Sequence, residues 1–275
     1  MTKTVTTVAD LRAALAASGA SPIGMVPTMG ALHEGHLSLV REAKKHAGLV
    51  VVSIFVNPTQ FAPNEDFDAY PRTLEADLDR LGGMAGLVFT PTAREIYPQG
   101  YATTITVGGP SAGLESDFRP HFFSGVATVV AKLLIAASPA VALFGEKDYQ
   151  QLQVVRQMVR DLALPVEIIG APTLREADGL ALSSRNAYLG AEERKIAGRL
   201  NLILKDAITR ARQGDMREAE SWAAKALRDV GFDSVDYVAI RDAETLTPVA
   251  TLERPARILA AAKVGRTRLI DNMAL

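Results

Sequence analysis

The stretch MVPTMGALHEGH, residues 25–36, determines the fold expected of this chain. The short apolar run at 23–26 predicts a strand, and residues 27–30 predict a turn because they contain proline and glycine. Apolar residues then recur at helical spacing and predict a helix over 34–46. A buried strand that leads through a turn into a helix is the unit from which parallel α/β sheets are built.

The two histidines of this stretch, His33 and His36, are three positions apart and so share one face of the predicted helix. They lie in its first turn, beside unpaired backbone N–H groups and the positive end of the helix dipole, which suits a phosphate. Gly35 lets a ligand approach the backbone. By themselves, the histidines fit two other interpretations, a pair of surface side chains or a metal site. The metalloprotease helix spaces its histidines by four, and the sequence indicates no third ligand, so metal binding is not expected.

Buried strands and helices alternate through the first part of the chain. Apolar, β-branched runs at 49–55, 86–89, 141–144 and 166–169 predict strands, and 103–107 predicts a weaker one. Helices are predicted at 8–18, after Pro71, at 125–137 and at 148–162, with loops at 57–67 and 108–120. This alternation predicts a Rossmann-like parallel α/β sheet with helices on both faces.

The pattern changes near Ala171. Helices are then predicted at 192–212 and 217–229, and strands at 235–240, 257–263 and 268–270. Two helices followed by neighbouring strands indicate a small α+β domain. We therefore expect two domains, residues 1–171 and residues 172–275.

Composition excludes several classes of protein. Of the 275 residues, 48% are hydrophobic and 22% charged, as in an ordinary globular chain. The net charge of −1 argues against a nucleic-acid partner, which usually requires a basic surface. The absence of cysteine excludes disulfides, thiolate metal sites and thiol nucleophiles. The N-terminus lacks the layout of a signal peptide, and the apolar run 49–56 is too short to cross a bilayer, so we expect a cytoplasmic protein with no membrane partner.

Two further clusters carry polar chemistry. The segment FGEKDYQQLQ, 144–153, follows a predicted strand, at the sheet edge where α/β proteins bind ligands. Its Lys147 offers a positive charge to a phosphate, although a solvated turn is an equally simple interpretation. The segment LSSRN, 182–186, contains two hydroxyls and a guanidinium, which are phosphate donors but also common in loops. The chain contains neither a Walker loop nor a dinucleotide glycine motif.

Together, these motifs resemble the pantothenate synthetase family, which belongs to the HxGH nucleotidyltransferase superfamily. The resemblance rests on MVPTMGALHEGH, FVNPTQF with EDFDAYPRT, GVATVVAKL, FGEKDYQQL and DGLALSSRNAYL, in the family's order. It covers nearly the whole chain. The resemblance implies a ligase in which the carboxylate of pantoate attacks the α-phosphate of ATP, releasing pyrophosphate. The amine of β-alanine then attacks the pantoyl adenylate, giving pantothenate and AMP.

The resemblance also implies roles for individual residues. The implied catalytic group, with His36 as proton donor, comprises His33, His36, Lys147, Ser183, Ser184 and Arg185. The implied ATP-binding residues are Pro27, Met29, Gly30, His33, Gly35, His36, Gly145, Glu146, Lys147, Asp148, Leu174, Leu182, Ser183, Ser184 and Arg185. Gln60, Gln151 and Asn57 are the residues implied for pantoate and β-alanine, and Asp77 for Mg²⁺. A homodimer that associates through the N-terminal domain is also implied.

Two segments depart from the family pattern. Ala76 and Arg80 stand where the family commonly has an aspartate and a glutamine near the magnesium, so the metal is expected to be held mainly by phosphates and water. In RPHFF, 119–123, His121 is one place early, and no role is transferred to it. Two alternatives stay open, an adenylyl- or cytidylyltransferase of the same superfamily and a non-catalytic nucleotide-binding regulator.

Overall fold

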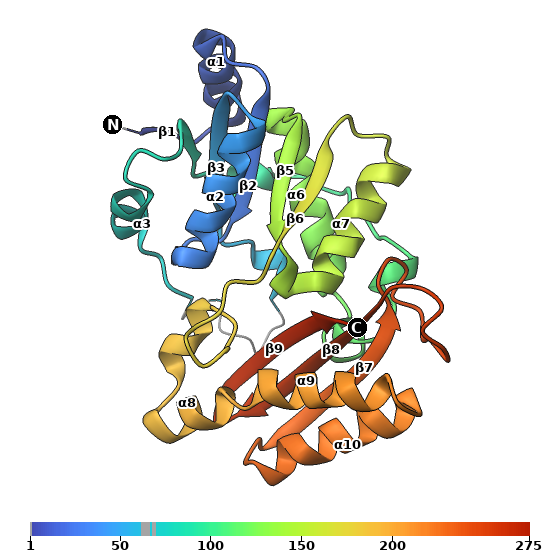
Figure 1. Cartoon of the computed structure of the whole chain (residues 1–275). Helices are drawn as coiled ribbons and strands as arrows, with labels where there is room; N and C mark the ends of the chain where they lie inside the picture. Colours follow the sequence, from blue (N-terminus) through green and yellow to red (C-terminus); the bar gives the residue numbers. More distant parts are fainter. Residues whose placement is uncertain (1, 62–66, 68–69) are drawn as a thin grey trace.

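A six-stranded parallel sheet forms the centre of the N-terminal part of the chain (Figure 1). The computed structural model describes residues 2–61, 67 and 70–275. In spatial order the strands are β1 (Lys3–Val5), β4 (Leu87–Phe89), β3 (Leu49–Ile54), β2 (Ile23–Thr28), β5 (Val141–Gly145) and β6 (Glu167–Ala171). From β2 the chain adds strands first on one side and later, with β5, on the other. The carboxyl ends of β2 and β5 therefore flank a topological switch point, where open α/β sheets bind ligands.

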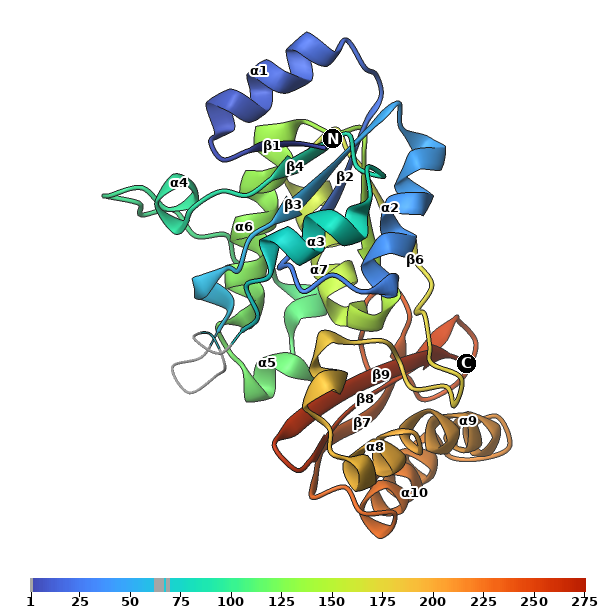
Figure 2. The same cartoon turned by 90° about the vertical axis from the view of Figure 1, so that its left-hand side faces the viewer.

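Helices cover both faces of this sheet, because alternate strand residues point to opposite sides (Figure 2). The helices of one face are α1 (Val8–Ser18), α6 (Phe122–Ala137) and α7 (Tyr149–Asp161), and those of the other are α2 (Glu34–His46) and α3 (Leu74–Leu81). Met25 packs in the main apolar cluster, on the face covered by α1, α6 and α7. Its neighbour Val26 packs on the other face, in a cluster with Leu39 and Val40 of α2. The predicted α/β sheet with helices on both faces is confirmed.

A smaller antiparallel sheet follows in the C-terminal part (Figure 1). Its strands are β7 (Ser234–Asp242), β8 (Ala256–Val264) and β9 (Thr267–Ala274), and its helices are α8 (Ala191–Ala197), α9 (Leu200–Ala211) and α10 (Met216–Asp229). Ile240 and Ile258 pack in one apolar cluster with α9 and α10. Ala239 and Leu259, on alternate positions, join the main cluster of the parallel sheet together with Tyr149 of α7. The small sheet thus lies between its own helices and the larger unit.

The first strand of the opening motif is longer than the sequence predicts. Pro27 and Thr28 were predicted to begin the turn, but they belong to β2, which pairs with β3 from Ile23 to Thr28. Pairing with β5 covers only Gly24 and Met25. The missing N–H of Pro27 therefore removes no bond to β5. The two strands separate beyond this point, and that separation opens the sheet edge to a ligand.

The strand predicted at 103–107 is wrong. This segment has no regular structure, and the backbone N–H of Ile105 donates to Thr128 Oγ1 on α6 at 2.9 Å. Ile105 and Val107 pack against the main apolar cluster. The edge beside β4 is instead occupied by β1, a three-residue strand that the sequence pattern does not predict. An alternating pattern shows that one side is buried, but does not identify the neighbour that buries it.

The long helix predicted at 192–212 is two helices, α8 and α9, separated at Gly198 and Arg199. Gly198 lies against the carboxylate of Asp178, where a side chain would collide. Short elements that were not predicted are α4 (Ala93–Ile96), α5 (Glu115–Phe118) and the 3₁₀ turns Pro58–Gln60, Gly109–Ser111, Glu146–Asp148 and Ser184–Tyr188. Residues 62–66 of the predicted loop lie outside the described residues.

The helices of the described residues do not reach the combination of length and hydrophobicity that crossing a membrane requires.

Candidate active site

A cleft of about 760 Å³ opens at the carboxyl ends of β2, β3 and β5. The segment after β6 and strand β9 form its opposite wall. All but three of the residues implied by the family resemblance line it, although they come from five separate parts of the chain. They are Pro27, Met29, His33, Gly35, His36, Asn57, Gln60, Gly145, Lys147, Asp148, Gln151, Leu174, Leu182, Ser183, Ser184 and Arg185. The fold therefore places these motifs around one space.

His33 and His36 form a reciprocal cap at the start of α2. His33 Nδ1 accepts the N–H of Gly35 at 3.1 Å, and His36 Nδ1 accepts the N–H of His33 at 3.3 Å. The ring centroids are 4.1 Å apart. Burial, the neighbouring His33 and Lys147 lower the pKa of His36 from 6.5 to about 3. Burial, Lys147 and Arg80 also lower the pKa of His33. Both rings are therefore neutral at pH 7, and a ring that accepts through Nδ1 carries its proton on Nε2.

Gly35 serves the histidine pair rather than a ligand alone. A Cβ atom built on it would lie 2.8 Å from His33 Cε1 and 2.9 Å from His33 Nδ1. Carbon atoms do not approach so closely, so any larger residue would displace the imidazole. From the sequence, the missing side chain of Gly35 was interpreted as room for a ligand. In the structure it also makes room for the His33 imidazole.

The loop between β2 and α2 is held by α3. Asp77, only 2% exposed, accepts the N–H of Ala31 at 3.0 Å and that of Leu32 at 2.7 Å through its two carboxylate oxygens. Arg80 donates to the Leu32 carbonyl at 2.7 Å. Ala31 has a φ of 48°, a left-handed conformation that costs free energy unless its surroundings fix it. The two α3 side chains thus fix the loop that leads into His33.

Asn57 and Gln60 form the floor beside Met29. Asn57 is 1% exposed, and its Nδ2 donates to Gln60 Oε1 at 3.1 Å and to the Gly125 carbonyl at 3.2 Å. Tyr97 donates to Asn57 Oδ1 at 2.7 Å, as does Thr59 Oγ1 at 3.0 Å, and together they fix the orientation of the Asn57 amide. Gln60 therefore has its oxygen engaged. Its NH₂ group donates one N–H to Met29 Sδ at 2.9 Å, and the second N–H is the donor that this side chain offers to an acceptor in the cleft.

The turn after β5 carries Lys147 to the cleft. This 3₁₀ turn, Glu146–Asp148, leads directly into α7. Lys147 Nζ lies 3.8 Å from the carboxylate of Asp148, which is half exposed. Gln151, on the first turn of α7, lines the cleft, whereas its neighbour Gln150 is buried and donates to the carbonyls of Pro110 and Gly113. Among the residues that the structure describes, the Gln151 amide has no such structural bond, in contrast to that of Gln150.

The segment 182–186, here called the serine–arginine loop, lies on the opposite wall. Ser183 Oγ accepts the N–H of Arg185 at 3.2 Å and so caps the 3₁₀ turn Ser184–Tyr188. Leu174 and Leu182 are joined by a backbone hydrogen bond of 2.9 Å, which closes the base of the loop. The hydroxyl of Ser184 and the guanidinium of Arg185 are thus presented from a closed loop opposite Lys147 and the histidines.

Gly30, Glu146 and Asp77 do not line this cleft. Gly30 and Asp77 border a neighbouring hollow of about 330 Å³. Glu146 turns its carboxylate to Arg257, 3.0 Å away. Their positions favour roles in shaping the loop and the turn.

Several cleft residues were not predicted. Among them are Glu115, Arg119, Tyr237, Arg268, Asp271 and Asn272. Arg268 and Tyr237, from the small sheet, each bond Glu115 of the larger unit, at 2.9 Å and 2.8 Å. One sequence signal was present for the last two, since the adjacent polar residues Asp271 and Asn272 stand between the apolar pairs 269–270 and 273–274.

The donor set suits a polyanion more than a bare cation. Lys147 and Arg185 bring positive charge, and the two histidines bring neutral N–H donors. Among the residues that the structure describes, no three histidine, aspartate, glutamate or cysteine side chains lie close enough to hold a metal ion. Both Asp77 oxygens already accept backbone N–H groups. A protein cage for Mg²⁺ is therefore not formed by these side chains.

Comparisons with known proteins cover the chain almost from end to end. The sequence model of the family described as pantoate–beta-alanine ligase matches residues 3–274. A pantothenate synthetase from Mesorhizobium japonicum is 61% identical over 91% of this chain and 89% of the relative. That of Caulobacter vibrioides is 55% identical over 98% of both chains. A crystal structure of pantothenate synthetase from Thermus thermophilus has a TM-score of 0.92 at 49% identity, over 98% of both chains. That of a pantoate–beta-alanine ligase from Francisella tularensis, complexed with beta-gamma ATP and beta-alanine, has a TM-score of 0.83 at 34% identity, over 99% of this chain and 97% of the relative.

Proposed function

Because the chain belongs to the pantoate–β-alanine ligase family, we propose that it condenses pantoate with β-alanine at the expense of ATP. A carboxylate oxygen of pantoate bonds to the α-phosphorus, the bond to the β-phosphate breaks, and pyrophosphate leaves. The amine of β-alanine then attacks the acyl carbon of pantoyl adenylate, loses a proton and displaces AMP. The observation that carries the proposal is the match over residues 3–274, together with the gathering of the matched motifs in one cleft.

The nucleotide is proposed to lie between the two walls of the cleft. His33 and His36 face it with Nε2–H donors, and Lys147 and Arg185 supply positive charge. Negative charge shifts toward the leaving pyrophosphate during displacement, and fixed donors and cations lower that barrier without rearranging. Because His36 is neutral at pH 7, we assign it hydrogen-bond donation to a phosphate oxygen rather than transfer of a proton from an imidazolium.

Pantoate is proposed to lie beside Gln60 and Gln151. Its carboxylate is ionised at neutral pH, so the first step needs positioning and no strong base. An amide can bond a hydroxyl or carboxylate without the charge of an arginine, which would weaken the nucleophile. The NH₂ end of Gln60 suits such an acceptor, and Asn57 fixes that orientation. We assign Asn57 a positioning role, since its amide is engaged within the protein.

The second step depends on keeping water from the reactive anhydride. We divide the chain after Ala171 into an ATP- and pantoate-binding domain, 1–171, and a small domain, 172–275, that covers the cleft. The serine–arginine loop and β9 bring this second part against the histidine wall. The Francisella relative was crystallised with β-alanine, which supports the same amine substrate here.

Magnesium is proposed to accompany ATP, held by its phosphates and by water. The described side chains offer no three-residue cage, and Asp77 is engaged with the loop, so no step is assigned to a protein-bound metal. A cytoplasmic homodimer that associates through the N-terminal domain completes the proposal.

The decisive experiment is isotope exchange between pyrophosphate and ATP. Exchange that requires pantoate but not β-alanine, with AMP released only when both are present, is the expected result. A nucleotidyltransferase would instead transfer a nucleotide to a phosphorylated acceptor and release no AMP. A regulator would bind ATP without exchange. Folded protein that gives no pantoate-dependent exchange would disprove the proposed ligase.

A further inference from the structure

Asn272, on β9, uses both N–H groups of its side-chain amide to hold the turn that carries Lys147. Its Nδ2 group donates to the Glu146 carbonyl at 2.9 Å and to the Lys147 carbonyl at 2.8 Å. Its Oδ1 accepts Arg257 Nε at 2.5 Å. The side chain is 3% exposed, and both N–H groups and the oxygen are engaged. An amide with every polar group engaged has one orientation, so the two carbonyls of the turn are fixed in place.

Arg257 reinforces the same arrangement. Its guanidinium lies 3.9 Å from the centre of the Tyr149 ring and donates to Glu146 Oε2 at 3.0 Å. Because Arg257 occupies Asn272 Oδ1, the amide cannot rotate by half a turn without losing that bond. The turn is therefore held by the small sheet through two hydrogen bonds to its main-chain carbonyls and one ion pair.

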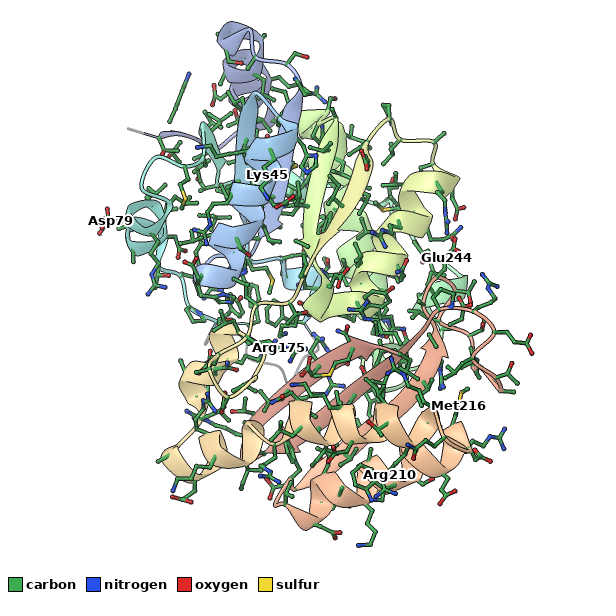
Figure 3. The ribbon with its side chains drawn as sticks, viewed as in Figure 1. Lys45, Asp79, Arg175, Arg210, Met216 and Glu244 are labelled. Carbon is green, nitrogen blue, oxygen red and sulfur yellow. The ribbon has the colours of Figure 1, made fainter. Side chains whose placement is uncertain are left out.

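Asp271, the preceding residue of β9, holds the other cation-bearing segment. Its carboxylate binds Arg175 through two bonds, of 2.7 Å and 2.8 Å, and is itself 2% exposed. Arg175 also donates to the Gly179 carbonyl at 2.9 Å, inside the loop that continues to Ser183 and Arg185. Figure 3 shows Arg175 between the two sheets. A two-bonded arginine–carboxylate pair defines direction as well as distance.

We propose that Asp271 and Asn272 are positioning residues that set the separation of the Lys147 turn and the serine–arginine loop across the cleft. The two residues are consecutive, and the N–H of Asn272 donates to Asp271 Oδ1 at 2.7 Å, so the two braces share one rigid strand. This inference rests on the proposed function, in which Lys147 and Arg185 bind the phosphates of ATP. Neither brace touches the substrate in this scheme. Each acts through the cation that it positions.

The physical effect of losing a brace follows from the geometry. Without the Asn272 donors, two carbonyls of the turn lose their partners, and the turn moves toward water to satisfy them. A cation displaced by about 1 Å from the phosphate costs about a hundredfold in rate, even though the protein remains folded.

The test compares Asn272→Asp with the wild type in pantoate-dependent pyrophosphate exchange. The carboxylate still accepts from Arg257 but cannot donate to the two carbonyls. We expect the exchange rate to fall about tenfold to a hundredfold, with the KM for pantoate within about twofold. Asn272→Ser keeps one donor and should lie between, and it carries the test if the aspartate variant does not fold. Asp271→Asn, which weakens the Arg175 pair, is expected to act in the same direction.

Gln153→Glu is the matched control. Gln153 is 4% exposed, and its amide also crosses between the two units, donating to the Ala243 carbonyl at 3.0 Å, but it holds neither cation-bearing segment. Its exchange rate should stay within about twofold of the wild type. If the exchange rate fell equally in Gln153→Glu and Asn272→Asp, Asn272 would only support the folded structure in general, and the proposal would be overturned.

A double-mutant cycle with Lys147→Ala shows whether Asn272 acts through the lysine. If it does, adding Asn272→Asp to Lys147→Ala lowers exchange by less than about threefold, because the positioned group is already gone. Multiplicative losses would contradict the inference. A wild-type enzyme with no exchange at all would instead disprove the proposed function, and wild-type exchange with an unaffected Asn272→Asp would disprove only this inference.

Discussion

The imidazole of His36 accepts the backbone N–H of His33 through Nδ1, at 3.3 Å. This bond ties the cap of α2 to the side chain that faces the cleft. It also determines the protonation of the ring, since an accepting Nδ1 in a neutral imidazole leaves the proton on Nε2. One hydrogen bond thus links the start of a helix to the donor proposed for the phosphate.

Replacing His36 by alanine removes that donor and should act on the transition state. We expect the adenylation rate to fall about a hundredfold to a thousandfold, with the KM for ATP changing less than about fivefold. Steady-state kinetics of pyrophosphate exchange measures both constants. His46→Ala, an exposed histidine at the other end of α2, is the control and should retain full activity. Near-normal adenylation by the His36 variant would show that its role is structural.

The lowered pKa of His36 predicts how stability depends on pH. In the unfolded chain this histidine binds a proton below pH 6.5, whereas in the folded chain it does so only near pH 3. The unfolded state therefore binds more protons in this window, and the free energy of unfolding falls as the pH falls from 6.5 toward 3. Burial of His33 acts in the same direction.

Urea unfolding at about pH 7 and about pH 5 tests this effect, with His36→Gln as the comparison. The variant should lose less stability on acidification than the wild type, by up to about 2 kcal/mol. Equal losses would mean that His36 takes up its proton at the same pH in both states.

The orientation of Gln60 should control the affinity for pantoate. Asn57→Asp cannot donate to Gln60 Oε1, so the Gln60 amide loses its fixed direction. The KM for pantoate should rise about tenfold, and that for ATP by less than about twofold. Tyr97→Phe removes one of the three hydrogen bonds to Asn57 Oδ1, the other two coming from Thr59, and should cause a smaller rise in the same constant. An unchanged KM for pantoate in both variants would show that the hydrogen bond between Asn57 and Gln60 does not influence pantoate binding.

Asp77 offers a choice between loop support and metal binding. The variant Asp77→Asn keeps only one acceptor oxygen. If Asp77 supports the loop, this variant should lower the rate of pyrophosphate exchange about tenfold and shift the half-saturating Mg²⁺ concentration less than about twofold. Titration of activity with Mg²⁺ distinguishes the two roles. Asp79→Asn, exposed on the same helix and labelled in Figure 3, is the control. A large rise in the Mg²⁺ requirement of the Asp77 variant would restore the metal role.

The sequence predicts local structure well where neighbouring residues determine it. The helix Glu34–His46 has its predicted bounds, because its cap and its apolar stripe lie within the same stretch. The buried runs around Val51 and Leu143 are strands, as predicted. The run 103–107 is not, because its Ile105 and Val107 pack against the main apolar cluster while β1, at residues 3–5, pairs with β4.

The site divides in the same way. The motif residues around His33, Lys147 and Ser183 were predicted and line one cleft. The contribution of Asn272 was not, because it depends on contacts with residues 125 and 126 positions earlier. A strand of the small sheet can be recognised from its apolar pattern, but the surface that it will meet cannot.

The apolar cluster that Ala239 and Leu259 share with Tyr149 joins the two sheets in one core. Pulling the sheets apart would expose that cluster, so heating should melt them together and calorimetry should record a single transition. A compound that occupies the cleft would then raise the melting temperature of the entire chain. A dye-based thermal shift can therefore screen for inhibitors without a substrate assay.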